Sequence, residues 1–280
     1  MRGRTLLERL DRPSDARLLI LSCKGLGCSH ASNLGVFSAL QTGIATSARI
    51  MVPAPWARDA AARYRGEDVG VDLTLNAESE RYRWGPVTHS PSLLDGDGGF
   101  PRTAEDTWEH ADLDEVRREC RAQVERAVYW GFDVSHLSSH LNVLVAKPEL
   151  FDAYLELALD LRLPMSLPDS SFERLVGFPF RRLADEEGAI VPDTVVSGPP
   201  GAGRRLLEKV LGEMGPGVTE VQLTPASDTP ELRALSGNWA GCSDDLATLT
   251  EDTSVAAMIA RSGVELIGFR ALRQVAESPR

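Results

Sequence analysis

Apolar and polar positions in this chain follow two periods, and each period predicts one kind of element. Apolar runs, or strict alternation of apolar and polar residues, favour strands. Apolar residues spaced three and four apart favour helices with one buried face. The two patterns take turns at intervals of roughly 25 residues, which is typical of parallel strands joined by helices. Strands are expected at residues 18–21, 45–52, 69–75, 133–145, 164–168, 218–223 and 264–269, and helices at 56–65, 113–130, 148–161, 204–214 and 244–261.

The stretch around the first strand organises the rest of the chain. The apolar residues 18–21 lead into a polar, glycine-rich turn at 22–29. A helix follows, which Ser32 or Asn33 is expected to cap. We predict one domain over residues 1–280 with an α/β fold, an irregular TIM-like (β/α) barrel of about seven parallel strands.

Two segments interrupt this alternation. Residues 77–111 form a long irregular insert with several aromatic residues and glycines, which favours a functional loop or lid. The alternative is a packing excursion over one end of the fold. Residues 172–203 contain prolines and glycines, and we expect a short helix there and at most one strand.

Charge and cysteine content narrow the class of partner. The chain carries 30 basic and 41 acidic residues, a net charge of −11, which argues against nucleic acid or an anionic membrane as partner. No apolar run is long enough to span a bilayer, and no signal peptide is recognised. The four cysteines are scattered and form no zinc motif. We therefore expect a cytoplasmic protein with reduced thiols.

Polar side chains gather at the ends of the predicted strands, where barrel enzymes carry their chemistry. Period two places His136, His140 and Asn142 on one face of the strand at 133–145. Asp72 lies on another predicted strand, and its expected position close to the two histidines favours a small-molecule pocket. The alternative is that these residues are simply solvated positions at a barrel mouth. Further candidates at strand ends are Lys24, His30, Thr74, Asn76 and Thr224.

Aromatic residues of the insert suggest one wall of this pocket. Tyr82, Trp84 and Phe100 are of the kind on which sugar rings or other flat rings stack. The alternative is that they pack the insert onto the barrel, which is the commoner role of aromatic side chains.

Several motifs occur in an order and spacing that resemble the YdjC-like (ChbG/HpnK) carbohydrate deacetylase family along most of the chain. The resemblance implies a distorted (β/α) barrel, and it allows a homodimer. The activity it implies is divalent-metal-dependent hydrolysis of an N-acetyl group from a small amino sugar, in which the metal activates water and an aspartate acts as base. The matching motifs are Gly27, His30, Asn33 and Gly35 in the first turn and helix, followed by TSARIMVPAPW, GVDLTLN, YRWGP, PSLLDGDGGF, HLSSHLNV and IARSGVELIGFRAL.

The chain departs from the family pattern at positions that the resemblance assigns to chemistry. Where the family carries two consecutive aspartates, one a base and one a metal ligand, this chain has Lys24 and Gly25. Asp72 stands where a histidine ligand is expected, and Thr224 stands where a late histidine is expected. Of the three implied metal ligands, His140 is the one that remains.

These replacements lead us to expect no catalytic metal. A lysine ammonium about 4 Å from a divalent cation would be repelled by several kcal/mol at an effective dielectric constant near 20. Zinc or magnesium would then bind only in a rearranged site that uses Asp72 and His140. Our hypothesis is that Lys24 instead pairs directly with Asp72 and takes the electrostatic role of the metal.

Three functions remain open, each with a small carbohydrate-like molecule as ligand. The first is a diverged metal-free enzyme with Lys24 as base or nucleophile, His140 as proton carrier and Asp72 as their partner. The second is a relative that binds a ligand without catalysis. The third is a metal-dependent N-deacetylase with a rearranged site of Asp72, His140 and either His30 or His136. Predicted substrate contacts in all three are His30, Asn76, Trp84, His136, Asn142 and Thr224.

Overall fold

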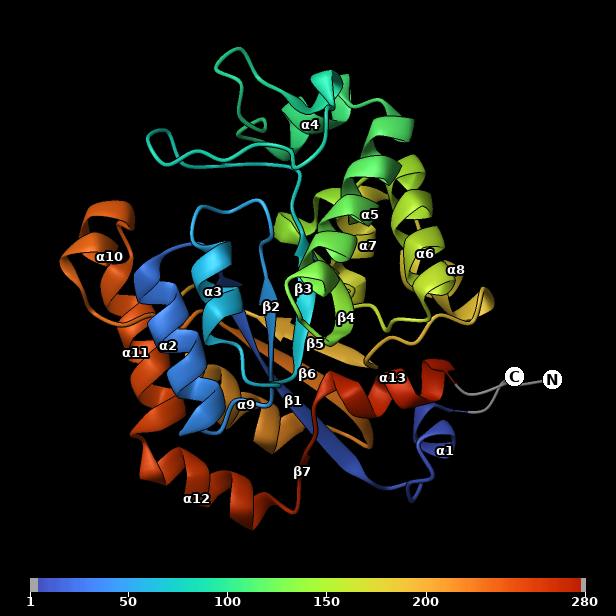
Figure 1. The fold of residues 1–280 in the computed structure, drawn as a ribbon. Coiled ribbons are helices and arrows are strands. Elements are labelled where there is room, and N and C mark those ends of the chain that lie inside the picture. The colour runs from blue at the N-terminus through green and yellow to red at the C-terminus, as the bar shows by residue number, and fades with distance from the viewer. Residues whose placement is uncertain (1–4, 278–280) are drawn as a thin grey trace.

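Seven parallel strands form one curled sheet within residues 5–277, the part of the chain that the computed structural model describes (Figure 1). Their order is β4-β3-β2-β1-β6-β5, and β7 pairs with the start of β1. This confirms the predicted α/β class and its irregular, barrel-like sheet. The strands are β1 (Arg17–Leu26), β2 (Ser47–Ile50), β3 (Val69–Leu73), β4 (Val134–Ser139), β5 (Thr194–Ser197), β6 (Gly217–Leu223) and β7 (Glu265–Leu266).

A short extended segment lies beside the outer edge of β4. Leu137 accepts a hydrogen bond from the Ser166 amide and donates its own amide to the Pro164 carbonyl, and a single bridge pairs Leu137 with Met165. The expected strand at 164–168 is thus reduced to one bridge. The sheet therefore curls toward closure without forming a regular eight-stranded barrel.

Helices surround the sheet and link its strands (Figure 1). No helix in the described part of the chain is long and apolar enough to cross a membrane. Most of the apolar core lies between these helices and the sheet. The helices are α1 (Leu6–Arg9), α2 (His30–Gln41), α3 (Ala57–Arg63), α4 (Ala104–His110), α5 (Leu113–Tyr129), α6 (Pro148–Leu161), α7 (Ser170–Val176), α8 (Phe180–Glu186), α9 (Gly203–Glu213), α10 (Pro230–Leu235), α11 (Trp239–Thr250), α12 (Thr253–Ser262) and α13 (Phe269–Glu277).

A second apolar cluster closes the N-terminal end of the sheet. It joins side chains of β1 and β6 to side chains of α1 and α13. This end is therefore filled, and the large cavity of the described residues lies at the C-terminal ends of the strands. The buried members of this cluster are Leu7, Leu18, Ile20, Ile190, Val218, Ile267, Phe269, Leu272 and Val275.

The first strand and its turn differ from the prediction. β1 extends to Leu26, and its register against β2 shifts between Cys23 and Leu26. Lys24 therefore lies within the strand. The cap of α2 is Ser29, whose hydroxyl accepts a hydrogen bond from the Ser32 amide, so the predicted caps were wrong.

The strand predicted at 133–145 ends at Ser139, because the backbone turns sharply after His140. Leu141 and Asn142 both adopt left-handed conformations, with φ of 50° and 58°. Residues in such a turn do not continue the alternation of a strand. The prediction that His136, His140 and Asn142 share one strand face was therefore wrong.

Other boundaries also differ from the sequence-based expectation. The helix predicted at 244–261 is divided into α11 and α12, because Asp252 caps a second helix. The strand at 264–269 is limited to β7, since α13 begins at Phe269. Helix α10 was not predicted, and residues 172–203 contain two short helices and β5.

The insert at 77–111 lies above the C-terminal ends of the strands (Figure 1). It contains α4 and a short 3₁₀ helix at Pro91–Leu93. The buried carboxylate of Glu119, on α5, accepts hydrogen bonds from the amides of Val87 and Thr88 and from the Thr88 hydroxyl. These contacts hold the insert against the sheet and fix one side of the opening.

Candidate functional site

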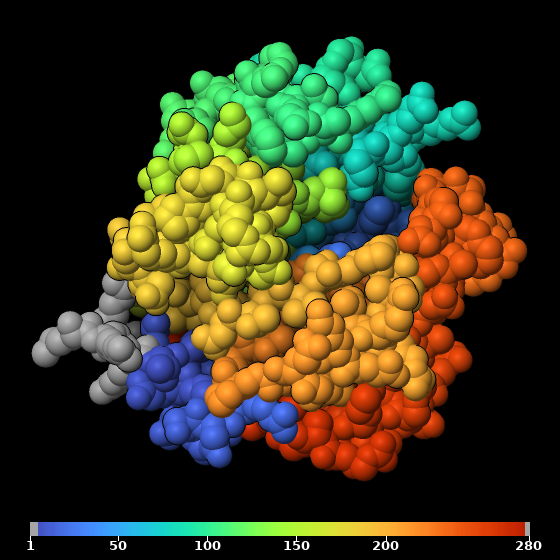
Figure 2. All heavy atoms as spheres, turned by 180° about the vertical axis from the view of Figure 1, so that it is seen from behind, coloured from blue at the N-terminus to red at the C-terminus, as the bar shows by residue number. Residues whose placement is uncertain are grey.

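A cavity of about 940 Å³ lies at the C-terminal ends of the strands. A hollow between the insert, the 138–142 turn and the segments around β5 and α10 is visible in Figure 2. Its floor is formed by polar and charged side chains of β1, β2, β3, β4 and β6, and its rim by the insert, by residues 168–169 and by α10 with the loop that follows it. Pockets that take small molecules commonly measure about 300–1,000 Å³, so the size suits a ligand such as one or two sugar rings.

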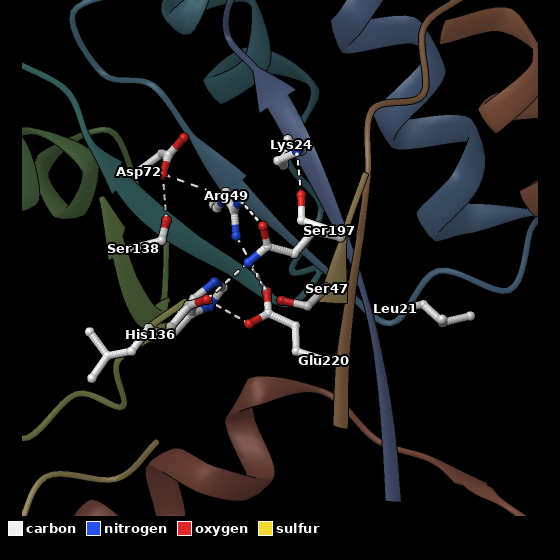
Figure 3. A network of polar contacts seen from close by, with 12 residues as sticks. Leu21, Lys24, Ser47, Arg49, Asp72, His136, Ser138, Ser197 and Glu220 are labelled. Carbon is white, nitrogen blue, oxygen red and sulfur yellow. Dashed lines mark hydrogen bonds and ion pairs between the residues drawn. The ribbon is translucent and has the colours of Figure 1, made fainter. Parts of the chain in front are cut away.

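Arg49 occupies the centre of the floor, and sequence reasoning missed it. Its side chain comes from β2 and is only 5% exposed. Its two terminal nitrogens donate to Glu220 at 3.3 Å and to Gln222 at 3.0 Å, and its Nε lies 3.5 Å from Asp72 (Figure 3). The signal was present: an arginine within a buried strand must find carboxylate or amide partners across the interior.

Asp72 is held as a carboxylate. It is 3% exposed, accepts a hydrogen bond from the Ser138 hydroxyl at 2.6 Å, and lies beside Arg49 and His140. Burial opposes its ionisation, but the Arg49 guanidinium and His140 outweigh burial and lower the pKa of Asp72 to about 2. At neutral pH this carboxylate is a fixed charge and a weak base.

His140 lies between two carboxylates at the cavity wall. Its Nδ1 is 3.4 Å from Asp72 and its Nε2 is 3.2 Å from Glu78. Burial lowers the pKa of His140, but the two carboxylates outweigh burial and raise it to about 9. The ring is therefore a cation at neutral pH, and both nitrogens serve as donors. Glu78, which sequence analysis did not single out, directly follows a buried run, residues 69–77, that begins with β3.

Lys24 faces the cavity from β1 without an ionic partner. Its ammonium donates to the Ser197 hydroxyl at 3.1 Å (Figure 3), and no described carboxylate lies within 4.0 Å of it. The predicted ion pair between Lys24 and Asp72 is absent, because Arg49 lies against Asp72 instead. Burial and the neighbouring Arg49 charge lower the pKa of Lys24 to about 8.

The residues at this floor do not fit a divalent metal ion as they stand. Within the described residues, no group of three or more histidine, cysteine or acidic side chains is placed to hold one. Both nitrogens of His140 face carboxylates, and Asp72 faces a guanidinium that stays protonated. Gly25 brings no side chain to the position where the family resemblance implies a ligand.

Three of the predicted substrate contacts line the cavity. Trp84 comes from the insert, Asn142 from the turn after β4, and Thr224 from the end of β6. Trp84 also donates its ring N–H to the Asn76 carbonyl, so it packs the insert as well as facing the cavity. Tyr82 lines the same side and donates its hydroxyl to the Cys28 carbonyl.

The other three predicted contacts lie away from the cavity lining. His30, at the start of α2, packs on the Trp56 ring at 5.0 Å between centroids. Asn76 is fully buried behind Trp84. His136 lies deeper in the interior than Asp72. Its ring stacks on Phe269, with 3.7 Å between ring centroids, and Phe269 belongs to the apolar cluster that closes the N-terminal end of the sheet. Of these three, only His136 lies in a strand, β4. Its position along the strand was expected correctly, but that position alone does not specify depth.

Comparison with known proteins agrees with this fold. The family model described as YdjC-like protein matches residues 18–261. A carbohydrate deacetylase of Geobacillus stearothermophilus is 30% identical over 260 residues, which cover 91% of this chain and 97% of that protein. A carbohydrate deacetylase of Thermus thermophilus is 40% identical over 165 residues, which cover 59% of this chain and 58% of that protein.

A solved structure resembles this one over most of its length. It is a putative cellobiose-phosphate cleavage protein of Enterococcus faecalis, with a TM-score of 0.77 and 24% identity, and the alignment covers 92% of this chain and 99% of that chain. At this identity the likeness supports the fold. Family membership rests on the two sequence comparisons, the family model over residues 18–261 and the Geobacillus stearothermophilus deacetylase: this chain belongs to the YdjC-like family.

Proposed function

We propose that this chain binds a small sugar-like molecule in the cavity and does so without a catalytic divalent metal. The curated relatives are named carbohydrate deacetylases, and the cavity volume suits a ligand of that class. The aromatic side chains of Tyr82 and Trp84 at the rim suit the apolar face of a sugar ring. The polar floor suits its hydroxyl groups.

The observation that carries the proposal is the placement of Arg49 between Asp72 and Glu220. A guanidinium cannot lose its proton in a protein, so this positive charge is permanent. A divalent ion about 4 Å from it would be repelled by on the order of 8 kcal/mol at an effective dielectric constant near 20. In our proposal, Arg49 supplies the charge that would otherwise require a metal ion.

The floor residues then divide into fixed charges and one reactive group. Asp72 and His140 keep their charges at neutral pH, with pKa values of about 2 and about 9, so Asp72 accepts hydrogen bonds from ligand hydroxyls while the His140 cation holds Asp72 and Glu78 in place. Lys24 has a pKa of about 8, which leaves it suited to exchange a proton near neutral pH. Trp84, Asn142 and Thr224 supply further contacts from the walls.

Isothermal titration calorimetry tests this proposal. Chitobiose and N-acetylglucosamine would be titrated into protein treated with a chelator, and then into the same protein resupplied with zinc or magnesium. We expect the same dissociation constant in both conditions. Binding that occurs only after metal is returned would contradict the proposal, and so would the absence of binding to any amino sugar or neutral sugar in either condition.

A matched pair of variants locates the ligand. Thr224→Val removes a hydroxyl from the cavity wall without changing the shape of the side chain, whereas Thr250→Val makes the same change on α11, away from the cavity. We expect the first to weaken binding about ten-fold, which corresponds to roughly 1.4 kcal/mol for a lost hydrogen bond. The second should leave the dissociation constant unchanged.

A further inference from the structure

Lysine is rare in this chain, and one of its few copies lies in the cavity. The sequence has 30 basic residues, but lysine occurs only at positions 24, 147 and 209. Lys147 and Lys209 are exposed, at the start of α6 and on α9. Lys24 is half-buried and lines the cavity floor. Nearly all basic residues of this chain are arginines, so the primary amine of Lys24 in the candidate site is an exception.

The surroundings of Lys24 favour a free amine over a permanent ion pair. Its Nζ has a neutral partner, the Ser197 hydroxyl at 3.1 Å. The acids whose charges act on Lys24 have partners of their own, because Asp72 and Glu220 contact Arg49 and Asp245 accepts three backbone amide hydrogen bonds. A lysine that is partly desolvated and lies near a second cation is a common form of activated amine nucleophile.

The titration of Lys24 agrees with this geometry. Burial and the Arg49 charge lower its pKa to about 8. At pH 7 about one-tenth of such an amine is unprotonated, compared with roughly one in 2,500 for an ordinary exposed lysine. The cavity therefore holds an amine that is available as a nucleophile at neutral pH.

We propose that Lys24 condenses with the carbonyl carbon of a reducing sugar in its open-chain form and holds the sugar as an imine. This inference rests on the proposed binding of sugar-like molecules in the same cavity. The Nζ lone pair attacks C1 to give a carbinolamine, and loss of water then leaves a C=N bond. The carbonyl oxygen and the two hydrogens of the neutral amine leave as that water, so the step needs no oxidant, reductant or metal.

Two neighbours of Lys24 take defined parts in this step. The Ser197 hydroxyl, within hydrogen-bond distance of Nζ, passes a proton between the nitrogen and the hydroxyl group that leaves. Arg49 does not touch the reacting atoms; its charge favours the neutral amine, so it is a positioning residue. Ser197→Ala should therefore slow imine formation.

Reductive trapping with sodium cyanoborohydride tests the inference. The full-length protein would be incubated at pH 7 with N-acetylglucosamine, and the product mapped by mass spectrometry of its peptides. We expect a sugar adduct on Lys24 at least about ten-fold more abundant than on Lys147 or Lys209. The neutral fraction of the Lys24 amine is larger than that of the two exposed amines, and this outweighs its lower basicity. Nonspecific glycation would label the two exposed lysines at least as fast.

Three controls make the result decisive. The alditol of N-acetylglucosamine, which has no carbonyl group, should give no adduct. Lys24→Arg keeps the charge and should abolish the selective adduct with the melting temperature retained. The double variant with Lys147→Arg and Lys209→Arg should still be labelled at Lys24.

The outcomes separate this inference from the proposed function. If calorimetry detects sugar binding but Lys24 is labelled no faster than Lys147, imine formation is overturned and the binding function stands. If neither sugar nor alditol binds and no selective adduct forms, both fail. Selective labelling of Lys24 that persists in Ser197→Ala at an unchanged rate would overturn the proton-transfer part assigned to that hydroxyl.

Discussion

At the scale of single residues, the charge of the cavity floor depends on Arg49. This side chain lies between two buried carboxylates, Asp72 and Glu220. The ion pairs are buried, so removal of one partner leaves charges that solvent cannot screen. Against the opposing effect of burial, a cation in this position favours the carboxylate form of Asp72.

Replacement of Arg49 should therefore be strongly destabilising. We expect Arg49→Met to lower the free energy of unfolding by about 3–5 kcal/mol, as is usual when one member of a buried pair is removed. Arg121→Met is the matched control, because Arg121 pairs with Asp160 at 2.6 Å on the exposed surface of α5 and α6. Urea denaturation should give at most about 1 kcal/mol for the control. Equal effects would contradict a special role for Arg49.

His140 makes the stability of the protein depend on pH in a defined direction. Its pKa is about 9 in the folded chain and near 6.5 when unfolded, so the folded state binds more protons between these values. Stability from this group is fully present below pH 6.5 and falls as the pH rises through 9. Lys24, whose pKa falls to about 8, acts in the opposite direction above pH 8.

Buried His136, whose pKa is lowered, acts in the opposite direction near pH 6.5. The difference between the wild-type chain and a His140 variant from pH 6.5 to 8 therefore reports on His140. We expect the free energy of unfolding to fall across this window in the wild-type chain. In His140→Gln the decline should be much smaller, because glutamine does not titrate. Denaturation curves at four pH values within the window measure the difference. A parallel decline in the variant would show that another group is responsible.

At the scale of elements, helix α5 positions the insert through one buried carboxylate. Glu119 is fully buried and accepts hydrogen bonds from Val87, Thr88 and Gln123, but it does not line the cavity. We expect Glu119→Ala to lower stability by about 1–3 kcal/mol through unsatisfied buried donors. Hydrogen exchange of the amides at residues 87–90 should increase.

The control for this variant lies on the same helix. Glu125 is exposed on α5, so Glu125→Ala should change stability by less than about 0.5 kcal/mol. Hydrogen exchange in the insert should also be unchanged. If Glu119→Ala left exchange at residues 87–90 as slow as in the wild type, the insert would be held by other contacts.

The elements themselves were largely predictable from local patterns. β3, α5 and α6 follow clear periods, and the structure places them within two residues of the expected bounds. Element boundaries were predicted wrongly where a single residue ends a periodic pattern. Asp252 starts α12 inside a predicted helix, and the left-handed Leu141 ends β4 inside a predicted strand. A period describes which residues face the same way; it does not reveal a cap or a turn that arises within it.

The candidate site was harder to predict than the fold. Lys24, Asp72, His140 and Thr224 were placed at the cavity correctly, because strand ends meet at one edge of a parallel sheet. The partner of Asp72 was not predicted. Arg49 comes from a neighbouring strand, and a local sequence pattern does not show which residue on another strand its side chain contacts. Depth within the interior, which separates His136 from the cavity, was likewise beyond such patterns.

At the scale of the whole molecule, the half-barrel is filled at one end and open at the other. The apolar cluster at the N-terminal end of the sheet lies beneath the floor, and the cavity is bordered by the insert and α10 at the opposite end. A ligand that binds only the folded chain stabilises it by about 2.7 kcal/mol at 100 times its dissociation constant. We expect chitobiose to raise the melting temperature in this way and excess zinc to leave it unchanged. A zinc-dependent rise would point to a metal site in the folded chain.

The most direct measurement is acetate release from chitobiose by chelator-treated protein, with and without added zinc or magnesium, combined with calorimetry on the same samples. We predict that the sugar binds equally in all samples and that added metal produces no acetate release. Acetate release that appears on adding metal and disappears with chelator would contradict a metal-free site built around Arg49 and Lys24.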